Sequence, residues 1–359
     1  MPEVATEGAN RAPSAAPRLH VFEGMTSATP LLRPTFASVG VPTFGFGTTV
    51  GGSLVGGALG ADEVVVVCIE GLAVAVYGCD TLGVGDAAYT IGAEWFDGSA
   101  VSTRLHAFHV EVDVDRLPTA YLGYETIPLD LADGVGALAD LDFDPVPADA
   151  LSGTTSVPVA LPDADLLVSA RFGPNLSMPL FDIENPGAAF DMLVPVLPGL
   201  SYDVVFAASN ADATVITWKR DVGLDAGAIA VAVPAEMVAP ADGAIGVDLT
   251  TSFGTTAVGG ARTYIWDSVG AGPDLALTTT RTSATVADPA LGGFAFPAGA
   301  AYNWTVLGHG DEGVDSAASG GYADYLTLFY GVLGGGGPGH DGDRTLALPT
   351  TDRGFTFAP

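Results

Sequence analysis

The sequence predicts an all-β protein, with two or three consecutive antiparallel β-sandwich domains after an extended N-terminal arm. Among its 359 residues, 48 Gly and 25 Pro interrupt long helices and favour turns. Between these breaks lie short runs rich in β-branched residues, with turn signals about every 8–12 residues, a spacing typical of sandwiches. Hydrophobic residues make up 48% of the chain, which excludes a compositionally disordered protein.

Composition shifts divide the chain into four segments. Residues 1–41 are rich in Pro, Ala, Ser and Thr and lack periodicity, which predicts an extended arm. Sandwich domains are expected at 42–139 and 140–235, with the Pro-rich DFDPVPAD near their boundary, and a third at 236–359. An ordered arm would need a partner to pack it, either a neighbouring subunit or the body of its own fold.

The clearest strands lie in the first of these domains. EVVVVCIEG and LAVAVYGCD are short apolar runs that end at Gly or Asp. In residues 108–115, Phe or Val at even positions alternates with His, Glu or Asp at odd positions. Side chains alternate between the two faces of a strand, so this pattern predicts one buried and one acidic face. No segment predicts a convincing helix, and DLADGVGALAD is expected to form a turn.

The charge of the chain excludes two classes of partner. With 42 acidic and 12 basic residues, the formal net charge is −30. Nucleic-acid binding needs a clustered basic face, and anionic membrane surfaces attract basic segments, so neither partner is expected. Lys219 is the single lysine. Codon bias in a GC-rich genome and adaptation to salt both produce such a composition, and both interpretations stay open.

No secretory signal and no membrane span are expected. Residues 1–24 contain no apolar h-region. Residues 34–61 carry no charge and hold Gly52, Gly56 and Gly60 at the GxxxG spacing that membrane helices use for close packing. Pro, Thr and Gly are dense in the same stretch, which favours a Gly-rich pair of strands.

The two cysteines, Cys68 and Cys79, leave two interpretations open. If Gly71 separates two strands, the cysteines can face each other across a hairpin, and a disulfide there would imply an oxidising compartment. Alternatively, they are two buried free thiols. The chain has no CxxC pair, so a thiolate zinc site is not expected.

Two segments of the C-terminal domain carry a family resemblance. Pro240–Val247 reads PADGAIGV, and Phe296–Val306 reads FPAGAAYNWTV. They resemble the domain start P-x-D-G-A-x-G-V and the strand P-x-G-x-x-Y-x-W-x-V of bacterial surface proteins with fibronectin type III or immunoglobulin-like modules. The resemblance implies an immunoglobulin-like sandwich whose Tyr, Trp and Val alternate into the core. The chain departs from the pattern at Phe253, where the family usually has Trp, and in its Gly-rich tail from His309, which is expected to form an elaborated loop.

Two acidic clusters are candidate calcium sites. Asp140, Asp142 and Asp144 form D-x-D-x-D, and on a strand these carboxylates would point the same way and repel one another. A bound Ca²⁺ would relieve the repulsion, because this cation takes several oxygen ligands. Asp341 and Asp343, after a Gly-rich run, form the second candidate. A solvated acidic loop is the alternative for both.

Histidine and tryptophan offer few further candidates. His106 and His109 are three residues apart, so on a strand they face opposite sides and cannot share a metal; both are expected at the surface or half-buried. Trp95, beside a turn in GAEWFDGS, is the candidate for an exposed ligand-binding aromatic. Trp304 is expected in the core because it alternates with Tyr302 and Val306.

These features together predict a non-enzymatic protein. The sequence contains no HExxH, GxSxG or P-loop motif. The expected function is that of a self-assembling structural subunit on an external surface: a cell-surface filament or layer, or a virion decoration or spike. Its expected partners are further copies or neighbouring surface or virion subunits. The alternative is an extracellular ligand-binding or adhesion module that binds glycans with the help of Ca²⁺, the one cofactor considered.

Overall fold

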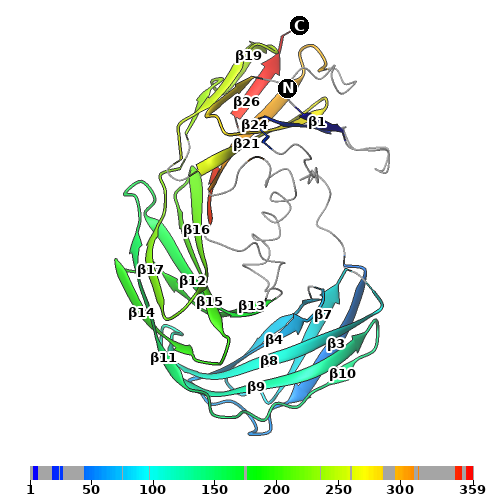
Figure 1. Ribbon diagram of the computed structural model, residues 1–359, viewed down its shortest axis with the longest axis vertical. Coiled ribbons are helices and arrows are strands. Elements are labelled where there is room, and N and C mark those ends of the chain that lie inside the picture. Colours follow the sequence, from blue (N-terminus) through cyan, green and yellow to red (C-terminus); the bar gives the residue numbers. More distant parts are fainter. Residues whose placement is uncertain are drawn as a thin grey trace.

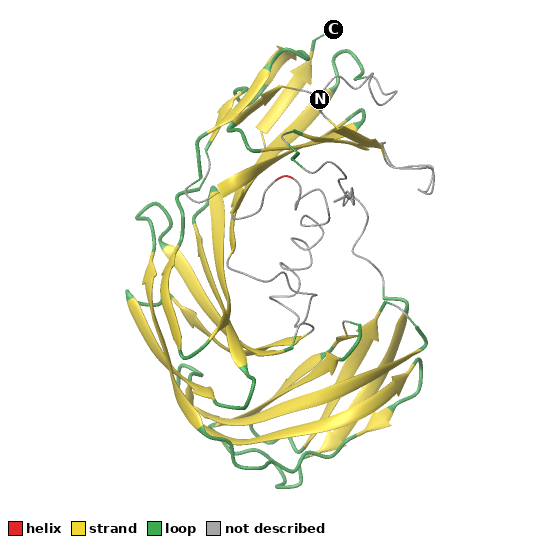
Figure 2. Cartoon of the chain, viewed as in Figure 1, coloured by secondary structure: helices red, strands yellow, loops and turns green. Residues whose placement is uncertain are grey.

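Strands are the main secondary structure of the residues that the structure describes, which confirms the predicted all-β class (Figure 2). The computed structural model describes residues 3–6, 18–23, 25–26, 44–310, 314, 344–349 and 353–358, with gaps at 75, 97, 174–175, 235, 259–260 and 286–295. Within these residues no helix is both long and apolar enough to cross a membrane.

The first sandwich consists of two four-stranded sheets. One has the order β10–β3–β7–β5, with strands Ala137–Leu138, Phe46–Ser53, Ala88–Trp95 and Val76–Tyr77. The other has the order β6–β4–β8–β9, with strands Cys79–Leu82, Glu63–Gly71, Ala100–Val112 and Pro118–Ala132. Their inner faces enclose a core that includes Trp95, Leu105 and Leu131.

Strand β8 confirms most of the predicted alternation. Phe108 and Val110 are 0% and 4% exposed. The strand ends at Val112, so the prediction is wrong at Val114, which is 96% exposed. The reason is a turn in which the carboxylate of Asp113 accepts hydrogen bonds from backbone N–H groups further along the chain.

The β6–β4–β8–β9 sheet is covered on both faces. From β8, Leu105 and Ala107 point into the first core, whereas Phe108 and Val110 pack against the second sandwich. The covering residues include Val146, Ala170, Leu176 and Met178. Strands covered on both sides are typically near-continuous apolar runs, which accounts for the unbroken VVVVCI of β4.

The second sandwich packs a three-stranded sheet against a four-stranded layer. The three-stranded sheet has the order β14–β11–β17, with strands Ala189–Pro195, Ala148–Ser156 and Asp225–Ala230. The layer has the order β16–β15–β12–β13, with strands Ala213–Val222, Ser201–Ser209, Asp163–Phe172 and Leu176–Glu184.

The third sandwich pairs another three-stranded sheet with a larger layer. The sheet β18–β20–β23 comprises Met237–Ala239, Ser252–Thr255 and Ser283–Thr285. The layer comprises β22 (Asp274–Thr279), β21 (Ala261–Gly270), β24 (Ala301–Gly310), β26 (Arg353–Phe357) and β19 (Ala244–Val247). Trp304 is 1% exposed, which confirms its predicted core position. Phe253 packs edge-on against the Trp304 ring, with the ring centroids 5.1 Å apart.

One strand joins the second and third sandwiches into a single sheet. Strand β25 (Arg344–Pro349) pairs with β16 of the second sandwich and with β24 of the third. The two layers and β25 therefore belong to one twelve-stranded sheet, which also includes β1 (Glu3–Thr6) and β2 (Arg18–Phe22) and runs along the molecule (Figure 1). The C-terminal tail, expected to form only a loop, thus supplies a connecting strand, and the second and third sandwiches are not independent.

The N-terminal arm is packed by its own chain. Strand β1 (Glu3–Thr6) pairs antiparallel with β2 (Arg18–Phe22), and β2 adds in parallel to β22 at the edge of the third sandwich (Figure 1). A neighbouring subunit and the body of the chain's own fold were the two partners expected to pack an ordered arm. In the structure, the body of the chain's own fold packs it. The rest of residues 1–41 lies outside the described part, apart from Glu23, Met25 and Thr26.

Two further details concern the first sandwich. Cys68 of β4 lies directly opposite Cys79 of β6, and the two are joined by a disulfide. In the GxxxG segment, a Cβ on Gly52 would lie 1.9 Å from the carbonyl oxygen of Ala139. Glycine at that position therefore serves a close approach of two extended segments, as a Gly-rich strand would.

We expect Phe108→Ala to lower the free energy of unfolding by about 3–5 kcal/mol, because it leaves a cavity in the contact between the first two sandwiches. Leu122→Ala on β9 is the control, since Leu122 is 40% exposed, and it should change stability by no more than about 0.5 kcal/mol. Chemical denaturation of both variants measures the difference. Equal small losses would contradict a tightly packed joint.

Candidate functional site

The joint between the first and second sandwiches contains a cavity of about 310 Å³. Its polar wall comes from strands β4, β8 and β9, which contribute Glu70, Arg104, His106, Tyr124 and Thr126. Its other wall comes from the second sandwich, with Phe172 and Gly173 at the end of β12 and the loop 197–200. Cavities between domains that combine apolar walls with a few converging polar groups are the usual places for small ligands.

A chain of hydrogen bonds runs through the polar wall. His106 Nδ1 lies 2.7 Å from Tyr124 Oη, and His106 Nε2 lies 3.1 Å from Glu70 Oε2. Glu70 and His106 are only 8% and 2% exposed. Strand pairing explains why Glu70 meets His106. Glu70 lies opposite Arg104 across the β4–β8 ladder, and His106, two residues further along β8, lies on the same face as Arg104.

The buried position of His106 favours a neutral imidazole. Burial is the main cause that lowers its pKa below the ordinary value, although the bond to Glu70 and the charge of Glu70 act in the opposite direction. In the neutral ring, Nε2–H donates to the Glu70 carboxylate, and Nδ1 accepts from the Tyr124 hydroxyl. Burial also raises the pKa of Tyr124, so its hydroxyl keeps the proton that it donates. Both ring nitrogens are thus occupied within the protein.

The second sandwich holds this network in place. The ring of Phe172 stacks on the His106 imidazole, with centroids 4.0 Å apart. The next residue, Gly173, has a φ of 63°, and a Cβ there would lie 2.9 Å from Glu70 Oε1. Glycine has no Cβ, so it adopts this positive φ and leaves room for the Glu70 carboxylate at no steric cost. The site therefore exists only while the two sandwiches are joined.

The cavity offers a ligand both charge and hydrogen-bonding groups. Arg104 is exposed and supplies guanidinium donors, while Glu70 supplies carboxylate acceptors. The hydroxyls of Tyr124 and Thr126 line the same wall, and Leu197 and Leu200 form an apolar boundary. This combination fits a small polar molecule that carries several hydroxyl groups.

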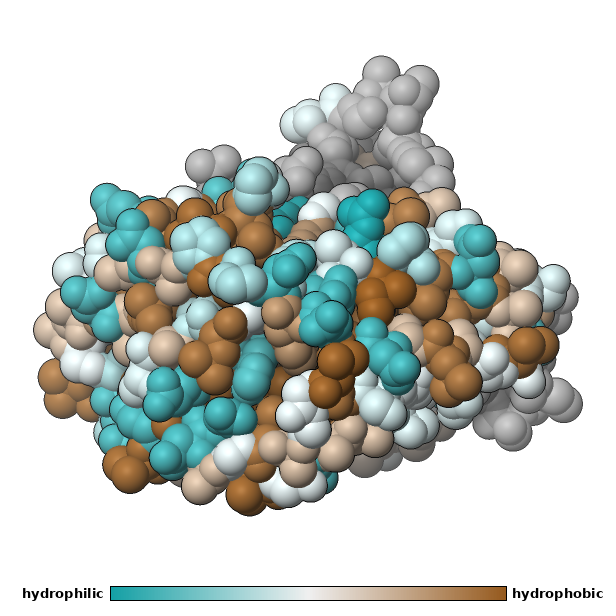
Figure 3. Space-filling model, turned by 90° about the horizontal axis from the view of Figure 1, so that it is seen from below, coloured by the Kyte–Doolittle hydropathy of each residue, from teal (hydrophilic) through white to brown (hydrophobic). Residues whose placement is uncertain are grey.

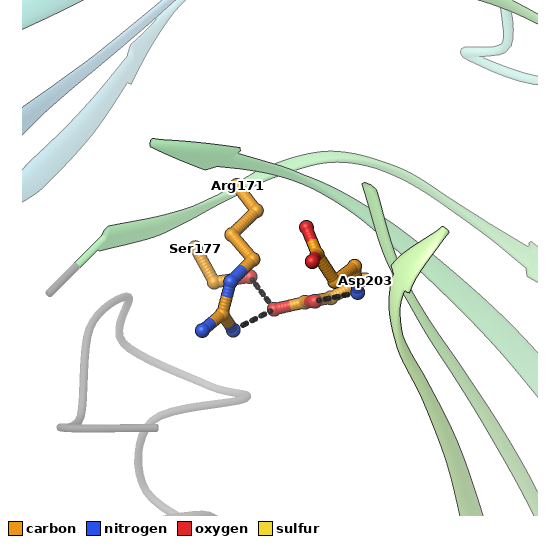
Figure 4. A network of polar contacts seen from close by, with 4 residues as sticks. Arg171, Ser177 and Asp203 are labelled. Atoms are coloured by element: carbon orange, nitrogen blue, oxygen red, sulfur yellow. Dashed lines mark hydrogen bonds and ion pairs between the residues drawn. The ribbon is translucent and has the colours of Figure 1, made fainter. Parts of the chain in front are cut away.

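A second polar network lies in the second sandwich and links four of its strands (Figure 4). The buried Asp203 carboxylate accepts hydrogen bonds from Arg171 Nη1 at 3.3 Å, from Ser177 Oγ at 2.9 Å and from the backbone N–H of Asp221 at 3.2 Å. These partners come from β12, β13 and β16, while Asp203 is on β15. A buried carboxylate with three donors is satisfied, and it holds the four strands in register.

The structure does not bring the first calcium candidates together. Asp140, Asp142 and Asp144 are exposed in the stretch between β10 and β11. One oxygen of Asp140 accepts the backbone N–H of Ser53 at 2.8 Å. Within the described residues, no group of three or more His, Cys, Asp or Glu is placed to hold a metal ion. Asp341 and Asp343 lie outside those residues, so calcium binding by that pair stays a prediction.

Two side chains are more buried than expected. The prediction of an exposed Trp95 is wrong: the side chain is 0% exposed, and its Nε1–H donates to the Gly98 carbonyl at 2.6 Å. Alternate residues of β7 point into the core, and Trp95 falls in the buried phase. His109 is half-buried as expected. For His106 the same expectation is wrong, because the second sandwich covers its face of the sheet.

The candidate site includes residues that the sequence analysis missed. Glu70 and Tyr124 were not singled out, and neither was Phe172. One signal was available: Glu70 stands inside an otherwise apolar strand, and a carboxylate buried there needs a partner. The partner itself comes from β8 and could not be chosen before the register of the sheet was known.

Comparisons with known proteins assign no family. No family model and no curated protein matches the chain. Among solved structures, the chicken CNTN1 FN1–FN3 domains give a TM-score of 0.18 at 9% identity over 83% of this chain and 90% of that one. A leucine-rich repeat protein from Bacteroides thetaiotaomicron gives 0.18 at 10% identity over 52% of this chain, which spans 25% of that protein. Both values are too low to bear on function, so the fold rests on the strand pairing described above.

We expect the joint to weaken as the pH falls below 6.5. In the unfolded chain His106 takes up a proton near its ordinary pKa of 6.5, whereas its pKa in the folded protein is lower. The unfolded state therefore binds more protons in this window, and stability falls with decreasing pH, by at most about 1.4 kcal/mol per pH unit for one proton. Glu70, Arg104 and Tyr124 are the titratable or charged groups facing the ring.

Denaturation midpoints measured from pH 7 to pH 5 test this expectation. His106→Gln keeps a polar side chain but removes the titration, so the slope of stability against pH should be shallower in this variant. An unchanged slope would show that His106 is not the group responsible.

Proposed function

We propose that this chain is a non-enzymatic structural subunit of an assembly on an external surface, either a cell-surface filament or layer or the exterior of a virion. The observation that carries the proposal is the way the third sandwich is built. Its edge is completed by β2 from the N-terminal arm, and β25 joins it to the second sandwich. Sandwiches that share one sheet are held at a fixed spacing, which suits a structural subunit.

Two observations support a location outside the cytoplasm. Disulfides persist in oxidising environments, and Cys68 and Cys79 are bonded. In addition, a three-stranded sheet packs against a larger layer in the third sandwich. This arrangement supports the resemblance to fibronectin type III or immunoglobulin-like modules of bacterial surface proteins, for which a role at the cell surface is usual.

The visible surface of the first sandwich does not favour contacts through a broad apolar face. Seen from below, its apolar residues are scattered among hydrophilic ones (Figure 3). The exposed apolar side chains of this sandwich include Val55, Val84, Leu122 and Leu138. Large contiguous apolar patches usually mark permanent interfaces, and scattered residues do not.

The mass of the particles in solution tests the assembly role. We expect light scattering to show particles that grow with protein concentration and with added salt, because salt screens repulsion between copies that each carry a net charge of −30. A variant that lacks residues 1–23 should form smaller particles or none. A 36.2 kDa monomer at every concentration and salt level would contradict the proposal.

A second function, ligand binding or adhesion, is favoured by the cavity at the joint. Its carboxylate, guanidinium and hydroxyl groups suit a glycan, and we keep Ca²⁺ as a cofactor of this alternative. On a glycan array, Arg104→Gln should lose any signal of the native protein. The matched control is Arg116→Gln, since Arg116 is an exposed residue of the β8–β9 turn. Silence of the native protein with and without a chelator would exclude this function.

A further inference from the structure

Strand β22 depends on the arm for its outer edge. All six of its residues, Asp274–Thr279, are buried. On one side β22 pairs antiparallel with β21, and on the other it pairs in parallel with β2. Without β2, the outer edge would present a row of unpaired N–H and C=O groups, which is a template for pairing with another chain.

The arm also brings apolar anchors to this edge. Val21 is 1% exposed and belongs to the same core as Leu277 and Trp304. Phe22 is 4% exposed and packs with Met25 and Val314 in a separate cluster. The backbone continues the ladder past β2, since the N–H of Glu23 donates to the Thr278 carbonyl at 2.8 Å. Main-chain bonds combined with side-chain anchors are the usual means by which an added strand binds a sheet edge.

The arm is followed in the chain by the first sandwich, but its strands pair with the third sandwich and not with the first. Strand β2 pairs with β1 and with β22 of the third sandwich, while the chain continues from the arm into the first sandwich at β3. Residues 24–43 connect the two, and twenty residues can span at most about 70 Å. An arm from a second copy can form the same ladder on β22.

The arm also carries little of the net charge of a very acidic chain. Residues 1–23 hold three Glu and two Arg, so they account for only −1 of the net charge of −30. Whole copies repel one another, but an arm entering the neighbour's sheet adds little to that repulsion. Charge therefore favours contact through this segment over contact between the bodies of two copies.

We propose that copies of this chain are linked by exchange of the arm: residues 18–23 of one copy take the β2 position beside β22 of the next. This inference rests on the proposed assembly function and names the partner, a second copy, and the contact. The donor precedes the first sandwich and the acceptor lies in the third, so the contact is head-to-tail. Such contacts repeat into filaments or close into rings.

Exchange competes with closure of the arm on its own chain. A connection of this length gives an effective concentration on the order of millimolar for the copy's own arm. Exchanged particles should therefore increase when the protein is refolded at high concentration and in salt, which weakens the repulsion between copies. Dilute refolding should give the closed monomer.

Engineered cysteines distinguish the two arrangements. Val21 and Leu277 are register partners, and the chain's two natural cysteines are already paired. Chains carrying only Val21→Cys are mixed with chains carrying only Leu277→Cys, refolded together at high concentration, and oxidised. Arm exchange predicts covalent dimers on a non-reducing gel, with none from either variant alone. The variant carrying both substitutions should give a ladder of covalent oligomers after concentrated refolding and a monomer after dilute refolding.

The outcomes separate this inference from the proposed function. Large particles of the native protein together with covalent dimers in the mixture support both. If large particles form but the mixture gives no dimers, and the doubly substituted chain closes only on itself, arm exchange is wrong while the assembly role stands. Covalent closed dimers without larger particles would support exchange and contradict the assembly role.

Discussion

The structure depends on apolar strands that one sandwich cannot cover alone. The outer face of β4 and β8 carries Phe108 and Val110, which are buried only because the second sandwich lies against them. The edge of β22 is closed only because β2 lies beside it. Burying apolar surface and pairing buried backbone groups are both required for stability, so the first and the third sandwich are each completed by a segment distant in the sequence.

The same constraint creates the candidate site. Covering the outer face of the β6–β4–β8–β9 sheet also buries Glu70 and His106, and buried polar groups need partners. They meet this need with each other and with Tyr124, while Phe172 of the second sandwich stacks on the imidazole. The cavity beside them is lined by residues of both sandwiches. A ligand could therefore bind there only while the two sandwiches are joined.

Local features were predictable from the sequence, and contacts between sandwiches were not. Alternation in residues 108–112 and in the strand that holds Trp304 is a property of a few neighbouring residues, and it indicated the buried faces. The packing of the second sandwich on the outer face of β4 and the pairing of β25 with β16 depend on residues far apart in the chain. A local pattern does not reveal such contacts. Trp95 was misjudged because the nearby turn suggested exposure, although its phase on β7 assigns it to the core.

Charge and strand completion together determine how such a chain can associate. A net charge of −30 opposes contact between two bodies, and the described face of the first sandwich has only scattered apolar residues to offset that repulsion. A nearly neutral strand that enters a neighbour's sheet avoids this difficulty, because it gains ladder hydrogen bonds and buries Val21 and Phe22 over a short length. Association would then depend on one edge strand, and salt would control its rate more than its specificity.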